Sequence, residues 1–397
     1  LMRLGLSQGL STGGFVPSGV AAISNSKSLD FDGSNDRLTF VTPSAFSGES
    51  LDNFNCTLSG WVNFDSITQY GAIISLGPAD FSISPLMSGS DVGIWLQDTA
   101  LTSAGTHDPS TGTWYHYVAT KSGTTYKFYA NGSLLGTATD TDSATIGAES
   151  YIGNNGFGSY LNGNVDEIAV WNSTLSDDEI AALYNNGTPT DLSKDGGGYT
   201  SSSGLQLWYR MGDATSPATD GTGSHTNKLH ILDQANTTLG SELVIADAYV
   251  AAEWYDYAGN TLTFGDNYMR CERTASGDSN GWFTYLRTSA SQNSILTSTP
   301  TTGSFYLLTF DVDTDDADAY VYMKFGNVAS TILSGTGNGT KTVVYKKGSS
   351  SHNDYLEGRN LSQGKFMKIS NVSVKKIMGV TAEMTNMDSS DIETESP

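Results

Sequence analysis

Short stretches in which apolar and polar residues alternate, separated by turns, recur along most of this chain and constrain its fold more than any other feature. In the clearest case, Tyr126–Ala130 is followed by Asn131-Gly132 and then by Ser133–Gly136. Asn-Gly is the strongest sequence signal for a two-residue hairpin, because both positions tolerate positive φ. Turns that recur roughly every ten residues favour antiparallel sheets packed as a sandwich. The 44 glycines and the 11% of aromatic residues also suit tight turns and pleated surfaces, so the pattern predicts an all-β protein.

Changes in composition divide the 397 residues into five segments. We expect a flexible Gly/Ser-rich arm over 1–26, a first sandwich over 27–190, a linker with one strand over 191–240, a second sandwich over 241–377 and an acidic tail over 378–397. A helix is expected after the first sandwich, because Ser176-Asp177-Asp178-Glu179 has the pattern of a capping box and Gly187 supplies a stop. The predicted fold is two antiparallel β-sandwich (jelly-roll) domains joined by a Gly/Ser-rich linker, with one short helix after the first sandwich.

The charge balance excludes some classes of partner. Lys and Arg number 20 against 42 Asp and Glu, a net charge of −22, whereas a surface that contacts nucleic-acid phosphates needs the opposite sign. No run approaches the ~18 apolar residues of a membrane span, and residues 1–9 lack the apolar core of a secretory signal. Cys56 and Cys271 fall in different predicted domains and are expected to be unrelated thiols. We therefore expect neither nucleic-acid binding nor membrane insertion.

Six segments of the first predicted sandwich carry a family resemblance. They are Ser28–Asp36, Thr57–Val62, Trp114–Ala119, Tyr129–Gly132, Gly163–Asn172 and Leu175–Tyr184. In this order, over residues 28–187, they resemble the laminin-G-like, concanavalin A-like jelly-roll family. The resemblance implies a β-sandwich and, as in some members of the family, a calcium site at its rim.

Asp166 is the carboxylate whose position most needs an explanation. Strict alternation places it with Ile168 and Val170 on an apolar face, where a carboxylate must be hydrogen-bonded, paired or bound to a metal. The resemblance implies calcium, with Asp32 and Asp36 of the first turn as further ligands, since calcium takes several carboxylate and carbonyl oxygens. The alternative is that Asp166 accepts backbone amides and that both loop acids are solvated.

The chain shows no recognisable catalytic constellation. Glycosidases on the concanavalin scaffold use two carboxylates that flank one bond. Asp166-Glu167 is the only candidate pair, and adjacent residues of a regular strand point to opposite faces. None of the five histidines suggests a Ser-His-Asp arrangement. We therefore predict that the protein is not an enzyme.

The second predicted sandwich carries another resemblance. Gly303–Val312 and Ile369–Lys376 resemble the central and closing strands of family 4-type carbohydrate-binding modules. A sugar-binding site needs exposed aromatic rings beside polar groups, and the best candidates are Trp254, Tyr255, Tyr257, Trp282, Tyr285 and Arg287. The alternative is that Trp254 or Trp282 fills the core of this domain. Trp95 and Tyr151 are secondary surface candidates in the first sandwich.

The combination of segments is similar to virion proteins of marine tailed bacteriophages, through the Gly/Ser arm, Leu207–Asp213 and a tail that contains Thr385–Asp388. The resemblance implies a non-catalytic structural component of the virion, a head or tail decoration or fibre protein. Its partners would be other virion proteins, further copies of itself in a homo-oligomer, and host-surface glycans. The alternative is a secreted, extracellular bacterial adhesin that binds glycans, or an accessory module of a polysaccharide-degrading system.

Overall fold

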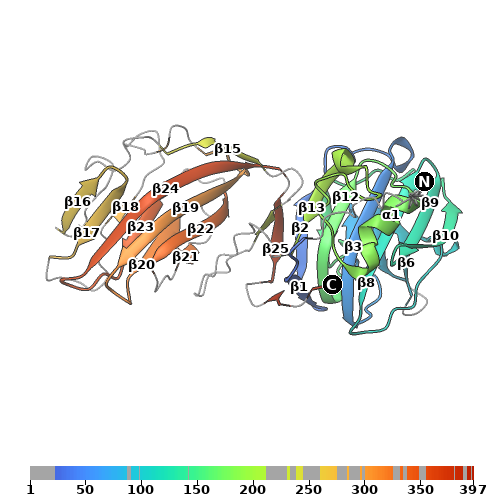
Figure 1. Ribbon diagram of the computed structural model, residues 1–397, viewed down its shortest axis with the longest axis horizontal. Coiled ribbons are helices and arrows are strands. Elements are labelled where there is room, and N and C mark those ends of the chain that lie inside the picture. Colours follow the sequence, from blue (N-terminus) through green and yellow to red (C-terminus); the bar gives the residue numbers. More distant parts are fainter. Residues whose placement is uncertain are drawn as a thin grey trace, which may run out of the picture.

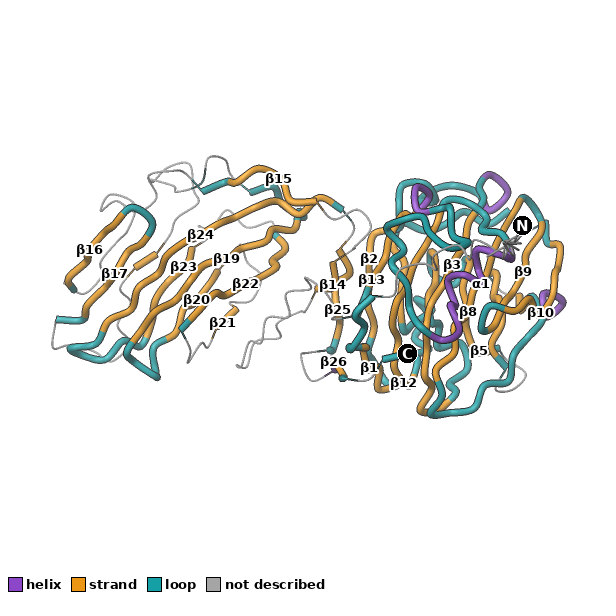
Figure 2. The backbone as a smooth tube through the Cα atoms, in the orientation of Figure 1, coloured by secondary structure: helices purple, strands orange, loops and turns teal. Residues whose placement is uncertain are grey.

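In the computed structural model, the chain forms two β-sandwiches that lie one beside the other along the longest axis (Figure 1). The structure describes residues 23–86, 91–97, 99–141, 143–211, 230–232, 238–244, 260–274, 284–285, 296, 300–324, 331–333, 338–347, 355–379, 381–387, 391–394 and 396–397. Strands dominate this part of the chain (Figure 2). The all-β class expected from the sequence is confirmed.

The first sandwich packs sheet A against sheet B. Sheet A contains, in spatial order, β10 (Ser133–Thr139), β9 (Thr125–Ala130), β8 (Trp114–Ser122), β3 (Cys56–Ser66), β12 (Asn162–Trp171), β1 (Ser28–Asp32) and β26 (Ile392–Glu393), and β13 (Leu205–Tyr209) also pairs with β12. Sheet B contains β14 (His230–Leu232), β25 (Thr381–Thr385), β2 (Arg37–Val41), β11 (Glu149–Ile152), β4 (Ile74–Leu76), β5 (Phe81–Pro85), β6 (Val92–Leu96) and β7 (Thr99–Ala100). The Asn131-Gly132 hairpin joins β9 to β10 as predicted.

One helix, α1 (Asp177–Tyr184), packs on the outer face of sheet A. Its predicted capping box is present: the Glu179 backbone N–H donates to Ser176 Oγ (3.3 Å), and the Ser176 backbone N–H donates to Glu179 Oε2 (2.9 Å). Ile180 and Leu183 turn inward onto an apolar cluster on this face. Four short 3-10 turns complete the helical part of the described chain: η1 (Leu51–Asn53), η2 (Thr102–Ala104), η3 (Asn185–Gly187) and η4 (Ser202–Gly204).

Residues 188–204 also pack on this face, although the sequence predicts a linker from residue 191. Tyr199 is fully buried. Trp171 Nε1 donates to its hydroxyl (2.8 Å), and that hydroxyl donates to the Leu192 carbonyl (3.0 Å). The linker expectation is wrong for this stretch, because one buried aromatic side chain anchors a segment whose composition is otherwise rich in Gly and Ser.

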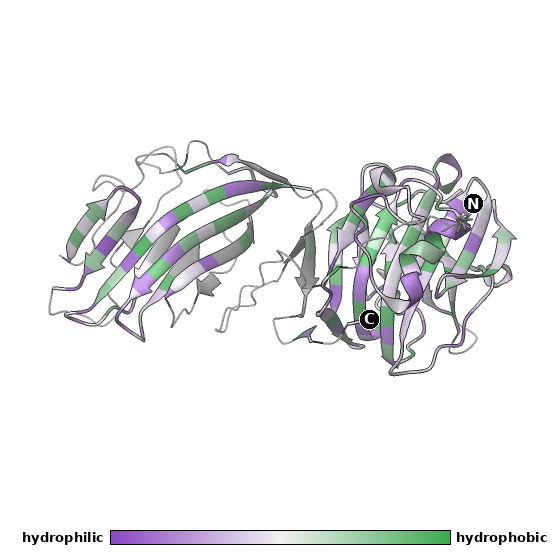
Figure 3. Ribbon diagram, in the orientation of Figure 1, coloured by the Kyte–Doolittle hydropathy of each residue, from purple (hydrophilic) through white to green (hydrophobic). Residues whose placement is uncertain are grey.

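The second sandwich packs sheet C against sheet D. Sheet C contains β16 (Thr261–Gly265), β17 (Tyr268–Glu272), β24 (Phe366–Met378), β19 (Phe305–Thr314) and β22 (Gly339–Lys346), and β15 (Thr238–Glu242) also pairs with β24. Sheet D contains β18 (Thr284–Tyr285), β23 (Tyr355–Arg359), β20 (Tyr320–Lys324) and β21 (Thr331–Leu333). Alternating hydropathy is visible along β19 and β24 (Figure 3). Cys271 lies in this core and Cys56 in the first, both as free thiols, as expected.

The second sandwich is inserted into a hairpin of the first. β14 and β25 pair antiparallel in sheet B, where Leu232 faces Thr381. β15 and β24 pair antiparallel in sheet C, where Thr238 faces Met378. The chain therefore leaves the first sandwich through β14, builds the second, and returns through β25 (Figure 1).

The expectation that residues 378–397 form an acidic tail is therefore wrong. β25 pairs with β2, and β26 pairs with β1, so the segment contributes a strand to each sheet of the first sandwich. Ala382 and Met387 lie in the core between these sheets. The linker expected over 191–240 likewise contains β13, β14 and the first residues of β15 instead of one strand. β13 is the one strand expected in this stretch. β14, β25 and β26 were missed because they are short and their partners lie far away in the sequence.

Candidate functional site

The three carboxylates expected to bind calcium do not meet at one site. Asp36 Oδ2 accepts the backbone N–H of Asp32 (3.0 Å) in the turn after β1. Asp166 lies on β12, four residues from Asn162, the register partner of Asp32, a separation of roughly 13 Å at 3.3 Å per residue. Among the residues that the structure describes, no group of three His, Cys, Asp or Glu side chains is placed to hold a metal ion. Calcium at Asp32 and Asp36 stays a prediction.

Asp36 makes the stability of this turn dependent on pH. Burial, with the charges of Asp32 and Asp391, raises the pKa of Asp36 to about 6. A carboxyl whose pKa is higher in the folded state contributes stability at low pH, and that contribution is lost as the pH rises from about 4 to about 6. Asp36→Asn stays neutral, so we expect its melting temperature, relative to the wild type, to be higher at pH 7 than at pH 4.

Thermal melts at both pH values, with calcium or a chelator, measure this effect. An equal difference between variant and wild type at pH 4 and pH 7 would contradict the shifted pKa of Asp36. If calcium binds here, it raises the melting temperature of the wild type at pH 7 but not that of Asp36→Asn. If the wild type has the same melting temperature with calcium and with chelator, the prediction that calcium binds at Asp32 and Asp36 is wrong.

A β-bulge changes the direction of Asp166 and Glu167. Glu167 has a φ of +50°, and the ladder between β12 and β3 shifts register between Asp166 and Ala169. A bulge adds one residue to a strand and reverses the alternation beyond it. Asp166 and Glu167 therefore both project from the outer face of sheet A, while Ile168 and Val170 enter the core. Strict alternation predicted Asp166 on the core face and the two carboxylates on opposite faces. Both expectations are wrong, because Asp166 lies on the outer face beside Glu167.

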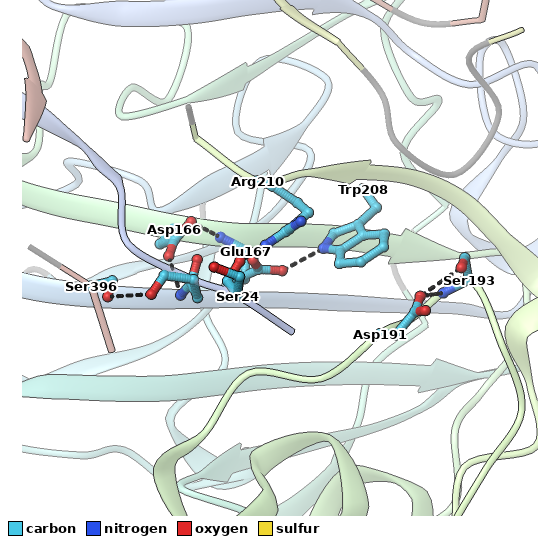
Figure 4. Close-up of polar contacts among 9 residues, drawn as sticks. Ser24, Asp166, Glu167, Asp191, Ser193, Trp208, Arg210 and Ser396 are labelled. Atoms are coloured by element: carbon cyan, nitrogen blue, oxygen red, sulfur yellow. Dashed lines mark hydrogen bonds and ion pairs between the residues drawn. The ribbon is translucent and has the colours of Figure 1, made fainter. Parts of the chain in front are cut away.

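The two carboxylates belong to a buried cluster that we call the terminal clasp: Asn25, Asp166, Glu167, Trp208 and Arg210. Figure 4 shows Asp166, Glu167, Trp208 and Arg210. Glu167 Oε2 accepts Trp208 Nε1 (2.5 Å), and Glu167 Oε1 accepts Arg210 Nε (3.1 Å). Asn25 Nδ2 donates to Asp166 Oδ2 (2.8 Å). The side chains of Arg210 and Glu167 are only 9% and 3% exposed, so this is a buried ion pair.

The terminal clasp connects both ends of the described chain to β12. Arg210 Nη2 donates to the Ser24 carbonyl, and Ser396 Oγ donates to the Asn25 carbonyl (3.2 Å). These contacts come from the first and last described segments, which meet here (Figure 4). Asp166 and Glu167 are both buried and accept hydrogen bonds, so neither presents an oxygen to a substrate. The clasp is a structural device.

Trp95 and Tyr151 lie on one row across the outer face of sheet B. Tyr151 pairs with Ser75, Ser75 with Ser82, and Ser82 with Trp95; we call these four residues the aromatic row. It spans three interstrand spacings, about 14 Å. The Tyr70 ring meets the Trp95 ring at 4.9 Å and 70°. Between the Trp95 and Tyr151 rings, Ser75 and Ser82 are buried, at 0% and 1% exposed, and Ser82 Oγ has no hydrogen-bond partner.

Backbone strain is concentrated beside the aromatic row. Tyr70, Ala79 and Gln97 have φ values of +62°, +55° and +45°, a region that side chains other than Gly and Asn seldom adopt. The Gln97 carbonyl accepts Trp95 Nε1, and the Ala79 backbone N–H donates to Ser75 Oγ (3.1 Å). Of the described residues, five that are neither Gly nor Asn have positive φ, and the other two lie at the terminal clasp. Strain of this kind persists where the surroundings impose it, often at ligand sites.

The candidates in the second sandwich stay predictions. Five lie outside the described residues: Trp254, Tyr255, Tyr257, Trp282 and Arg287. Tyr285 lies on β18, which pairs with β23.

Two features of these sites were missed by reasoning from the sequence. Leu207–Asp213 was used only as part of a family resemblance, whereas in the structure its Trp208 and Arg210 hold Glu167. Tyr70 carried no signal, because nothing in the residues around it indicates a positive φ or a contact with Trp95.

Comparison with solved structures finds distant likenesses. A putative carbohydrate binding protein from Bacteroides ovatus ATCC 8483 aligns at 18% identity with a TM-score of 0.39, over 53% of this chain and 56% of that one. The heptameric SAP-like pentraxin from Limulus polyphemus aligns at 18% identity with a TM-score of 0.32, over 41% of this chain and 84% of that one. Domain 4 of an extracellular arabinanase from Geobacillus stearothermophilus aligns at 19% identity with a TM-score of 0.28, over 35% of this chain and 68% of that one. This chain thus spans little more than half of the first of these proteins.

Comparison at the level of sequence identifies the first sandwich. No curated protein matches the chain. Within the part that the structure describes, no helix has the length and apolar character to cross a membrane. Residues 32–181 match the family model of the concanavalin A-like lectin/glucanases superfamily, in agreement with sheets A and B. The match agrees with the resemblance inferred from the sequence, and it covers less than half of the 397 residues.

Proposed function

We propose that this chain is a non-catalytic glycan-binding protein whose aromatic row contacts the glycan. The observation that carries the proposal is the row itself: Trp95 and Tyr151 flank small polar residues on one sheet face, and Tyr70 packs against Trp95. Aromatic rings stack on the apolar face of a sugar ring, while a few placed polar groups bond to its hydroxyls. The strained residues Tyr70 and Gln97 both contact Trp95, one through its ring and the other through its backbone carbonyl, and so hold this ring in place.

The environment of the one candidate acid pair supports binding without turnover. Retaining glycosidases place two carboxyl groups about 5–5.5 Å apart on either side of the sugar bond. Asp166 and Glu167 lie on one face, but Asn25 covers the first, and Trp208 and Arg210 hold the second in a buried ion pair. Both carboxylates are buried and already engaged by these side chains.

We further propose that several copies are displayed on a phage virion, where they meet host-surface glycans. Two chain connections join the second sandwich to the first. Such a double connection suits a protein that presents both sandwiches on the surface of a particle. Several copies on one particle would convert weak binding into avidity. Recovery of the protein with assembled particles supports this setting. Recovery only as a free secreted protein would favour the alternative, a bacterial adhesin.

Replacement of Trp95 tests the site. A central aromatic contact of a binding site contributes about 2 kcal/mol or more, so Trp95→Ala should weaken glycan binding about thirtyfold. The matched control is Trp114→Ala, because Trp114 has a similar partial exposure but lies in sheet A. A glycan array identifies the probe, and titration calorimetry with that glycan measures affinity.

If no glycan on the array binds the protein, the proposal of glycan binding is wrong. If Trp95→Ala and Trp114→Ala bind the glycan with equal affinity, the binding site does not include the aromatic row. Thermal melts of both variants check that a loss of binding does not come from unfolding.

A further inference from the structure

The strand β16 forms one edge of sheet C. Of the strands that the structure describes, only β17 pairs with it. Alternate residues of an antiparallel strand direct their backbone N–H and C=O groups toward opposite sides, so β16 presents a row of these groups on the side away from β17. Figure 1 shows β16 at the end of the second sandwich that lies away from the first. An edge of this kind can pair with a strand of another chain.

The other edge strands of the described chain are protected against such pairing. β22 carries two lysines, and charged side chains at an edge oppose the approach of a further strand. Register shifts interrupt the ladders of β10 and β15, and bulges also disfavour pairing at an edge. β13 is almost entirely buried. The remaining edge strands, β7, β14, β18, β21 and β26, have at most three residues each.

β16 has none of these protections. Its five residues, Thr261–Gly265, include no charge and no proline, and its ladder with β17 is regular. Leu262 and Phe264 pack against the core of the second sandwich, yet both are only half-buried. Their exposed surface is the part that a further strand alongside β16 would cover, and burial of apolar surface favours association.

The sequence of β16 is complementary to itself. A two-fold axis through Thr263 pairs the strand antiparallel with β16 of a second copy, so that Thr263 faces Thr263 and Leu262 faces Phe264. Pairs of threonines, and pairs of an aromatic with an apolar residue, are favourable across antiparallel strands. Both copies then use the same surface, as a two-fold interface requires. Leu262 and Phe264 of both copies lie on the same face of the joined sheet and extend its apolar side.

The charges near β16 permit this approach, although the chain has a net charge of −22. The charged side chains of the neighbouring strand β17, Arg270 and Glu272, pair with each other (2.8 Å). Asp266 follows β16 directly, and in the two-fold arrangement it faces Asn260 of the second copy instead of another carboxylate. No like charges are therefore opposed along the paired strands.

We propose that β16 is a self-association surface, at which two copies of this chain join sheet C of each into one continuous sheet. Two strands of five residues cover much less than the roughly 1,600 Å² of a standard interface, so the pairing is weak between free molecules. It becomes effective where several copies are held close together. β16 lies away from the first sandwich (Figure 1), so this contact does not involve the aromatic row.

Sedimentation equilibrium of the full chain, from micromolar to millimolar concentration, measures the association. We expect a monomer–dimer equilibrium for the wild type. Thr263→Lys should associate about tenfold more weakly or less, because two lysines then face each other at the two-fold axis. The matched control is Thr137→Lys, which changes an exposed threonine of the bulged edge strand β10 and should associate like the wild type. Thermal melts check that both variants are folded.

A cysteine at the two-fold axis tests the register. The Cβ atoms of directly facing residues lie about 4.5–5.5 Å apart, close to their separation in a disulfide, and both natural cysteines are buried. Under mild oxidation with oxidised glutathione, Thr263→Cys should form a covalent dimer about tenfold faster than Thr137→Cys, whose cysteines meet only by collision. Equal rates overturn the register of the pairing.

A wild type that stays monomeric at millimolar concentration overturns the proposal. Equal association of the wild type and Thr263→Lys also overturns it, because the contact between copies then lies elsewhere. These measurements contain no glycan, so their outcome is independent of the site proposed on the first sandwich.

Discussion

A chain that ends at Met378 should lose most of the stability of its first sandwich. The truncation removes β25, which lies between β14 and β2 in sheet B, and β26, the partner of β1 in sheet A. It also removes Met387 and Ala382 from the core, and deletion of one large buried side chain alone costs about 2–5 kcal/mol. We expect a loss of at least 4 kcal/mol, which lowers the melting temperature by about 10 °C in a domain of this size.

Scanning calorimetry measures this loss as a downward shift of the first sandwich's transition. The matched control replaces residues 233–380 with Asn-Gly, which closes the β14–β25 hairpin directly. Leu232 and Thr381 already face each other in the ladder, and Asn-Gly fits a two-residue turn. This variant lacks the second sandwich but keeps β25 and β26, so its first sandwich should melt as in the full chain. A stable truncated chain together with an unfolded hairpin-closed variant would contradict the insertion.

Replacement of Arg210 by Met should destabilise the protein by about 3–5 kcal/mol, because it leaves the Glu167 carboxylate buried without its cation. The Ser24 carbonyl also loses its donor. The control is Lys127→Met, because the pair of Lys127 with Asp177 is partly exposed, at 34% and 57%. Such surface pairs contribute at most about 1 kcal/mol.

Urea unfolding measures both variants. Arg210→Met/Glu167→Gln should recover part of the loss, since the buried charge is gone from both partners. Equal losses for Arg210→Met and Lys127→Met would show that the ion pair of the terminal clasp is no more important than a surface contact. Equal losses for the single and double variants would show that the charge of Glu167 is not the cause.

The features predicted correctly from the sequence depend on neighbouring residues. The Asn131-Gly132 turn is set by two residues that accept positive φ. The start of α1 is set by Ser176 and the residue three positions later. The longer strands, such as β19 and β24, follow from alternation within five to ten residues. Each of these signals is complete within a few positions of the chain, so no knowledge of the tertiary structure is needed to read it.

The candidate sites were only partly predictable. Trp95 and Tyr151 could be named as surface aromatics, but their place on one row depends on the pairing of four strands. Tyr70 reaches Trp95 through a backbone conformation that Tyr rarely adopts. Asp166 was singled out correctly as a carboxylate in need of partners. Its Oδ1 accepts the backbone N–H of Glu167, in line with the alternative of backbone amides, and its Oδ2 accepts Asn25 Nδ2, far away in the sequence.

The sequence by itself determined the all-β class, the hairpin, the capped helix and the similarity of residues 32–181 to the concanavalin A-like lectin/glucanases superfamily. The tertiary structure alone decided that the last twenty residues complete the first sandwich, that Asp166 and Glu167 share a face, and that β16 lies at an edge of sheet C. The physical reason is the same in all three cases. A short edge strand and a bulge are weak local preferences, and they are stabilised only by hydrogen bonds and packing from residues distant in the chain.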